Sequence, residues 1–137
     1  MSDLVRTLRE EHRALVVHLE AAARLGPGSP GAKRELDAVK ALVLAHLDRE
    51  DRVFYKALEQ AARTDKEVET ALQRFAKDSG EVSRRAIAFF ERYEHGGEGI
   101  EYARAFGEFL ASLRIRLRHE EDVLYPLFEQ VLLGKAA

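Results

Sequence analysis

The sequence contains no cysteine, few prolines and no excess of basic charge. Without cysteine it cannot form disulfides, zinc–thiolate sites, iron–sulfur clusters or a thiol nucleophile. The 22 basic side chains are balanced by 24 acidic ones, which is not the charge pattern of a nucleic-acid-binding protein. No apolar run reaches the roughly 18 residues of a membrane-spanning helix, and residues 1–6 lack the apolar stretch of a secretory signal. We therefore expect a soluble, cytoplasmic protein that binds neither nucleic acid nor membrane.

Few chain breakers interrupt the sequence, and they divide it into four segments. Glycine and proline cluster at 25–31, glycine recurs at 95–99, and a weaker polar break lies near 63–67. The intervening segments are rich in Ala, Leu, Glu and Arg, which favour helices. The pattern predicts helices over residues 3–24, 33–61, 66–94 and 101–132. Short links between long helices favour antiparallel neighbours, so we predict an all-α, up-down-up-down antiparallel four-helix bundle that forms one domain, residues 1–137.

Apolar residues recur at helical spacing in each segment, so that they share one face. In the second segment, for example, Val39, Val43 and Val53 contribute to this apolar stripe. Four such stripes directed at one axis make a single core. They predict the fold and indicate nothing about function.

Polar side chains interrupt these stripes near their centres. His12 does so in the first segment and Glu120 in the fourth. In the second segment His46 and Glu50 lie four residues apart, and therefore on one helical face. Arg116 lies one turn before Glu120, nearer the stripe edge, where its side chain either faces the axis or reaches solvent. Because an unpaired carboxylate is costly in an apolar core, the inward carboxylates must be neutralised, paired or bound to a cation.

The second and fourth segments also resemble each other. Residues 46–60, H-L-D-R-E-D-R-V-F-Y-K-A-L-E-Q, align with residues 116–130, R-L-R-H-E-E-D-V-L-Y-P-L-F-E-Q. Glu50 then falls on Glu120, and the flanking Val, Tyr and Glu-Gln positions coincide. Carboxylate and imidazole groups projected inward from facing helices are how bundles hold iron or manganese. The alignment therefore favours a metal site on the bundle axis.

The other histidines and the aligned tyrosines receive structural roles. His18, His95 and His119 fall on the flanks of their segments or in a loop, and we predict them at the surface. Tyr55 and Tyr125 are predicted to pack and to form hydrogen bonds, and we assign them no redox chemistry.

The motifs resemble those of the hemerythrin-like (HHE cation-binding) family over essentially the whole chain. H-L-D-R-E at 46–50 matches the motif of the family's second helix, V-L-Y-P at 123–126 matches the ending of the fourth, and E-H-R-A-L at 11–15 resembles that of the first. The resemblance implies a four-helix bundle with a non-haem di-iron site bridged by two carboxylates. It places metal ligands at His12, His46, Glu50 and Glu120.

The sequence departs from the family pattern in the third and fourth helices. Arg116 stands where the family's fourth helix presents histidine, and the third helix has Ser79 and Ser83 at inward positions where histidine is expected. These serines either leave a polar gap or are small residues that let helices pack closely. Arg116 removes a ligand and adds a permanent positive charge. We interpret the chain as a degenerate family member whose incomplete ligand set is enough for one metal and poor for two.

Functions from different classes remain open. By resemblance, the chain is a metal-binding domain that holds iron at a reduced or mononuclear site and binds or senses a small gas, O2 or NO, or handles iron. Alternatively, it is a metal-free regulatory or partner-binding bundle in which Arg116 bridges Glu50 and Glu120 as a buried ion network. Oxidase or peroxidase chemistry at a residual metal is a further option, but we favour binding or sensing over enzymatic turnover.

Overall fold

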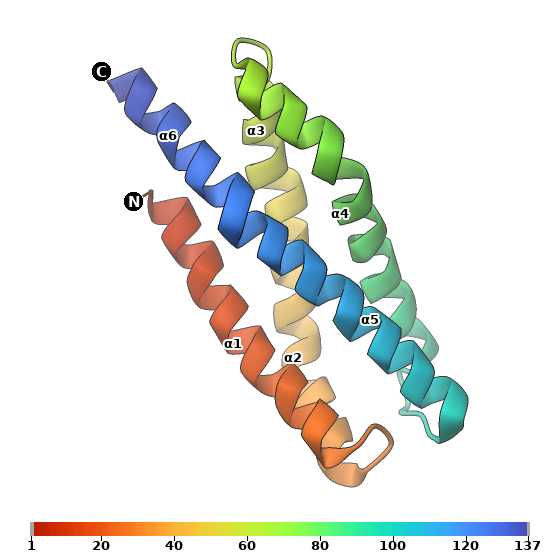
Figure 1. Cartoon of the computed structure of the whole chain (residues 1–137). Coiled ribbons are helices and arrows are strands. Elements are labelled where there is room, and N and C mark those ends of the chain that lie inside the picture. Colours follow the sequence, from red (N-terminus) through yellow and green to blue (C-terminus); the bar gives the residue numbers. More distant parts are fainter. Residues whose placement is uncertain (1, 137) are drawn as a thin grey trace.

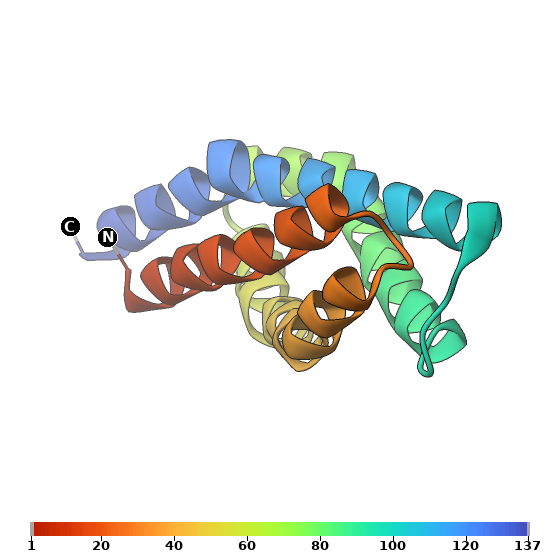
Figure 2. The ribbon, with the colours of Figure 1, turned by 90° about the horizontal axis from the view of Figure 1, so that it is seen from below.

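A computed structural model describes residues 2–136 and has the all-α four-helix bundle that the sequence predicts (Figure 1). Its helical segments form four rods that alternate in direction, and both chain ends lie at the same end of the bundle (Figures 1 and 2). The segments are α1 (Asp3–Leu25), α2 (Pro30–Arg49), η1 (Glu50–Phe54), α3 (Tyr55–Ala61), α4 (Lys66–Arg92), α5 (Gly99–His119), η2 (Glu120–Leu124) and α6 (Tyr125–Ala136). The second rod joins α2, η1 and α3, and the fourth joins α5, η2 and α6. Within residues 2–136 no strand is present.

The connection between α1 and α2 follows from its breakers. Gly26 adopts a φ of 89°, which favours glycine, and so α1 ends at Leu25. The Ser29 hydroxyl accepts a hydrogen bond of 3.1 Å from the backbone N–H of Ala32. Pro30 occupies the first helical position, where its missing N–H costs nothing. The second rod therefore begins three residues earlier than the predicted residue 33.

Two π-helical turns, η1 and η2, interrupt the second and fourth rods at the aligned segments. The backbone N–H of Tyr55 bonds to the Glu50 carbonyl, and that of Tyr125 to the Glu120 carbonyl. In a regular α-helix, a residue five positions on is rotated by roughly 140° around the axis. The wider turn instead aligns each tyrosine with the glutamate before it. It also turns Val53 outward, so the prediction that Val53 joins the core stripe is wrong: it is 50% exposed.

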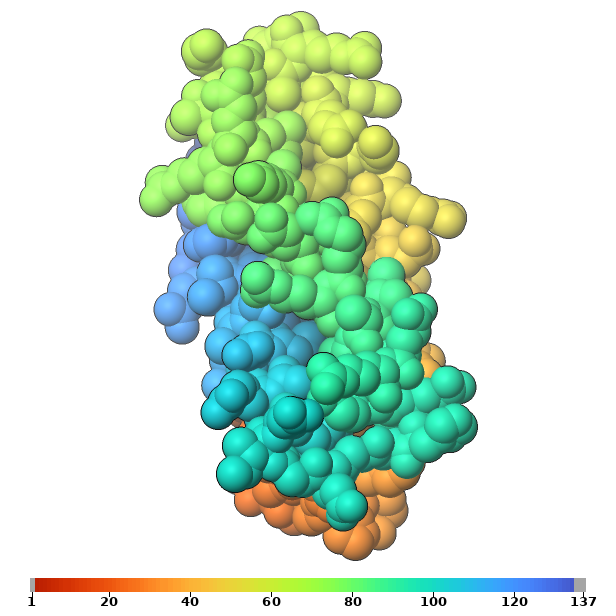
Figure 3. All heavy atoms as spheres, turned by 90° about the vertical axis from the view of Figure 1, so that its right-hand side faces the viewer, coloured from red at the N-terminus to blue at the C-terminus, as the bar shows by residue number. Residues whose placement is uncertain are grey.

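Apolar residues fill the bundle in two clusters, one on each side of a layer of buried polar side chains. This polar layer consists of His12, His46, Glu50, Ser79, Ser83, Arg116 and Glu120. One cluster includes Leu15 and Val43, and the other includes Leu8, Phe54 and Leu124. Figure 3 shows the molecule from the side on which α4 lies, and there α4 runs between the second and fourth rods. The polar layer thus lies inside the bundle, with apolar packing above and below it.

No helix within residues 2–136 is long and apolar enough to cross a membrane. The cytoplasmic location stays a prediction. So does the assignment of residues 1–137 to a single domain.

Candidate metal centre

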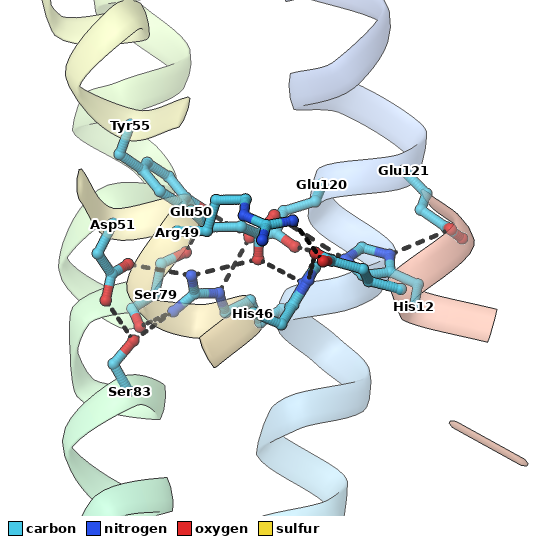
Figure 4. Close-up of polar contacts among 12 residues, drawn as sticks. His12, His46, Arg49, Glu50, Asp51, Tyr55, Ser79, Ser83, Glu120 and Glu121 are labelled. Carbon is cyan, nitrogen blue, oxygen red and sulfur yellow. Dashed lines mark hydrogen bonds and ion pairs between the residues drawn. The ribbon is translucent and has the colours of Figure 1, made fainter. Parts of the chain in front are cut away.

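Four buried polar side chains from three of the four rods meet in the middle of the bundle (Figure 4). His12 comes from α1, His46 from α2, Glu50 from η1 and Glu120 from η2. None of them is more than 2% exposed. One nitrogen or oxygen of each lies within 4.8 Å of those of the other three. The structure therefore brings together the four residues that the sequence singled out.

The spacing of the donor atoms suits a single ion. His12 Nε2 lies 3.2 Å from Glu120 Oε1 and 3.9 Å from Glu50 Oε2, and His46 Nε2 lies 3.0 Å from Glu50 Oε1. Metal–ligand bonds of about 2.0–2.2 Å place neighbouring ligand atoms roughly 3–3.5 Å apart. Small side-chain movements would bring all four donors to bonding distance.

Two of these donor atoms are buried without a hydrogen-bond partner among residues 2–136: His46 Nε2 and Glu120 Oε1. His46 Nε2 lies 3.0 Å from Glu50 Oε1, and Glu120 Oε1 lies 3.2 Å from His12 Nε2, but neither contact has the geometry of a hydrogen bond. Such unsatisfied atoms are rare in native interiors because they cost desolvation energy. A metal ion would satisfy both atoms at once, so the donor set fits a bound cation.

Both imidazoles are oriented by carboxylates behind them. His46 Nδ1 lies 2.8 Å from Glu11 Oε1, and His12 Nδ1 lies 3.2 Å from Glu121 Oε1. In metal sites such a carboxylate fixes the tautomer and leaves Nε2 free to bind. Sequence patterns did not single out Glu11 or Glu121. Each is adjacent to a candidate ligand in sequence, but each contacts a histidine on another helix, and adjacency does not reveal that pairing.

Arg116 faces the axis and contacts the carboxylates of the site. It is 1% exposed, so of the two predicted orientations the structure has the inward one. Its Nε donates to Glu120 Oε2 at 2.9 Å, and its Nη2 donates to Glu50 Oε1 at 3.4 Å and to Asp51 Oδ1 at 3.0 Å. The guanidinium therefore bridges the two aligned glutamates, as the ion-network alternative requires.

The remaining nitrogen of Arg116, Nη1, donates hydrogen bonds to two residues of α4. It donates to the Ser79 carbonyl and to Ser83 Oγ, each at 2.7 Å. The Ser83 hydroxyl in turn donates to Asp51 Oδ2 at 2.6 Å. Ser79 and Ser83 are thus hydrogen-bond partners of the arginine, not merely small residues for close packing.

The tyrosines at equivalent positions of the second and fourth rods each donate a hydrogen bond to the glutamate of the other rod. Tyr55 Oη donates to Glu120 Oε2 at 2.9 Å, and Tyr125 Oη donates to Glu50 Oε2 at 2.6 Å. Tyr125 Oη also lies 2.9 Å from His12 Nε2. Because η1 and η2 turn each tyrosine toward the axis, the tyrosine of one segment reaches the glutamate of the other.

The arginine alone does not fully compensate the two carboxylates. Burial and the nearby charge of Glu120 raise the pKa of Glu50, despite His46 and Arg116. Burial would also raise the pKa of Glu120, but its contact with His12 and the charge of Arg116 outweigh burial and lower that pKa to about 2. Burial would lower the pKa of His46, but Glu50 and Glu11 outweigh burial and raise it. With both glutamates ionised, two negative charges face one guanidinium, and either a protonated imidazole or a bound cation would supply the missing positive charge.

The other histidines lie outside this layer. His95 is exposed, as predicted, whereas His18 is partly exposed, with its side chain 41% exposed and its Nδ1 2.7 Å from Glu35 Oε2. The prediction that His119 lies at the surface is wrong: it is partly buried, because its ring packs against Phe75 with 4.3 Å between the ring centroids. None of the three contributes an atom to the four-residue group.

Comparison with known proteins gives one match. The family model described as the hemerythrin HHE cation binding domain matches residues 3–128. No curated protein and no solved structure matches the chain. The matched stretch includes all four donor residues and Arg116.

Proposed function

Because the chain belongs to the hemerythrin HHE cation-binding family, we propose that it binds a single iron ion through His12, His46, Glu50 and Glu120. The observation that carries the proposal is that two buried atoms of the site, His46 Nε2 and Glu120 Oε1, form no hydrogen bond. They belong to a group of four donors that lie within 4.8 Å of one another. Two imidazoles and two carboxylates suit Fe(II), Mn(II) or Zn(II), and the family resemblance favours iron.

The chain's own residues would prepare this site before the metal arrives. Glu11 and Glu121 hold His46 and His12 with Nε2 toward the site. The apolar clusters on both sides exclude water, which strengthens electrostatic interactions between the ion and its ligands. Burial and the two glutamates raise the pKa of Tyr125, so its phenol stays protonated and can act as a hydrogen-bond donor.

We further propose that the bound state serves to bind or sense a small gas, O2 or NO, or to handle iron. Iron with an open coordination position supplies the chemistry for binding such a ligand. The Tyr125 hydroxyl lies 2.6 Å from Glu50 Oε2 and 2.9 Å from His12 Nε2, beside the atoms that would hold the ion. This proposal rests on the family resemblance and on the enclosed setting of the site.

Metal content tests the proposal directly. The protein is stripped with a chelator, reloaded anaerobically with Fe(II), desalted, and analysed for iron per chain. We expect about one iron in the wild type and less than roughly a tenth of that in His12→Gln and His46→Gln, because each loses a ligand. The matched control is His18→Gln, the same substitution at a histidine whose side chain is 41% exposed. Less than about a tenth of an iron in the wild type would overturn the proposal.

The metal-free alternative is favoured by one observation: the Arg116 guanidinium donates hydrogen bonds to both glutamates. A regulatory or partner-binding bundle built on this network would unfold at the same temperature with and without Fe(II). An iron-dependent rise in the melting temperature would exclude it, since a ligand that binds the folded state raises that temperature.

A further inference from the structure

The guanidinium of Arg116 is surrounded by oxygen atoms, in an arrangement that would equally suit a metal ion. A guanidinium has five N–H donors, and here every nitrogen donates to oxygen at 2.7–3.4 Å. The acceptors are Glu120 Oε2, Glu50 Oε1, Asp51 Oδ1, the Ser79 carbonyl and Ser83 Oγ. Carboxylate, carbonyl and hydroxyl oxygens are the ligands that hard divalent cations prefer.

The two glutamates are shared between this position and the imidazoles. Glu120 Oε2 accepts from Arg116, while its Oε1 lies 3.2 Å from His12 Nε2. Glu50 Oε1 lies 3.4 Å from Arg116 Nη2 and 3.0 Å from His46 Nε2. The carboxylates thus link the imidazole pair to a second, positively charged position, as bridging carboxylates link two metal ions.

We infer that the Arg116 guanidinium serves as a permanently bound second cation of this site, so that the chain accepts one metal ion and not two. The inference rests on the proposed function, because it presupposes the metal at the imidazoles. Arginine suits the role because it is always charged and its planar donors reach several acceptors at once. Since it is tethered to α5, no chelator can remove it. The role also explains why α4 has serines where the family has histidine. The Ser79 carbonyl and the Ser83 hydroxyl accept hydrogen bonds from the guanidinium, whereas imidazoles would compete with it for the same space.

Arg116→Ala tests this assignment, with Arg114→Ala as the matched control. Arg114 is on the same helix, and its side chain is 50% exposed and lies 3.6 Å from Glu20. Without a cation, Arg116→Ala leaves buried carboxylates uncompensated, so the melting temperature of the metal-free protein should fall by roughly 10–20 °C. Adding ethylguanidinium should recover at least about half of that loss, because this cation can occupy the oxygen-lined position without binding at the imidazoles.

Metal content gives the second measurement. The wild type and Arg114→Ala should hold about one Mn(II) per chain, and Arg116→Ala about two. Arg116→Lys keeps the positive charge and should hold one, so it tests the inference even if the alanine variant does not fold without added cation. Two Mn(II) in the wild type or in Arg116→Lys would overturn the inference and leave metal binding itself established. One Mn(II) in Arg116→Ala, with no recovery by ethylguanidinium, would overturn it in the same way. A wild type without metal would overturn the proposed function and with it this inference.

Discussion

Glu50→Gln should abolish metal binding while leaving the metal-free protein about as stable as the wild type. Glu50 is fully buried and accepts a hydrogen bond from Tyr125 at 2.6 Å and a long one from Arg116 at 3.4 Å. A glutamine carbonyl can keep the bond from Tyr125. Its amide can donate to His46 Nε2, which forms no hydrogen bond in the wild type. The substitution also removes one of two neighbouring buried carboxylates, whose repulsion contributes to the raised pKa of Glu50.

The expected magnitudes differ clearly between the two states. In the metal-free protein, the lost bond from Arg116 costs about 1 kcal/mol, and the new bond to His46 with the relieved repulsion offsets a similar amount. In the wild type, free metal at 100 times its dissociation constant stabilises the fold by about 2.7 kcal/mol. For a chain of this length that raises the melting temperature by roughly 10 °C. The variant should lose this metal-dependent rise and keep its metal-free melting temperature within about 4 °C.

Calorimetric unfolding with and without buffered Fe(II), under anaerobic conditions, measures both quantities in one series. Glu59→Gln is the control, because it makes the same charge change at an exposed position of α3 in the same rod. A metal-dependent rise that persists in Glu50→Gln would show that Glu50 is not a ligand. A loss of more than about 3 kcal/mol in its metal-free stability would show that the carboxylate is needed for the fold, contrary to this reasoning.

Two further substitutions separate ligand orientation from fold stability. Glu11→Gln should weaken Fe(II) binding by about 10- to 100-fold in a titration, because the carboxylate that holds His46 Nδ1 at 2.8 Å is lost; an unchanged affinity would show that Glu11 does not orient His46. Tyr55→Phe should lower the melting temperature of the metal-free protein by roughly 5 °C, because it removes hydroxyl contacts with Glu120 at 2.9 Å and Ser79 at 2.8 Å. Its metal content should stay at the wild-type value, and a loss of metal would show that Tyr55 positions the ligand Glu120.

The helical rods were predictable because their signals are local. Hydrophobic spacing near 3.6 residues and a few Gly and Pro clusters identified four helices within a few residues of their observed ends. The inward positions of His12, His46, Glu50 and Glu120 followed from the same periodicity, since each interrupts an apolar stripe. The prediction was wrong at Val53, where a π-helical turn changes the rotation of the helix. Periodicity assumes a constant rotation per residue and does not detect such a turn.

By itself, the sequence determined the fold class, the family and the four polar residues that face the bundle axis, because these depend on residue type and spacing along single helices. Only the tertiary structure decided which groups pair across helices: Arg116 with both glutamates and Asp51, and Glu11 with His46. Such pairs depend on how far each helix is shifted and rotated against its neighbours, which is set by side-chain packing between rods. For the same reason the sequence left Arg116 with two possible orientations, and packing against α4 placed its guanidinium on the bundle axis.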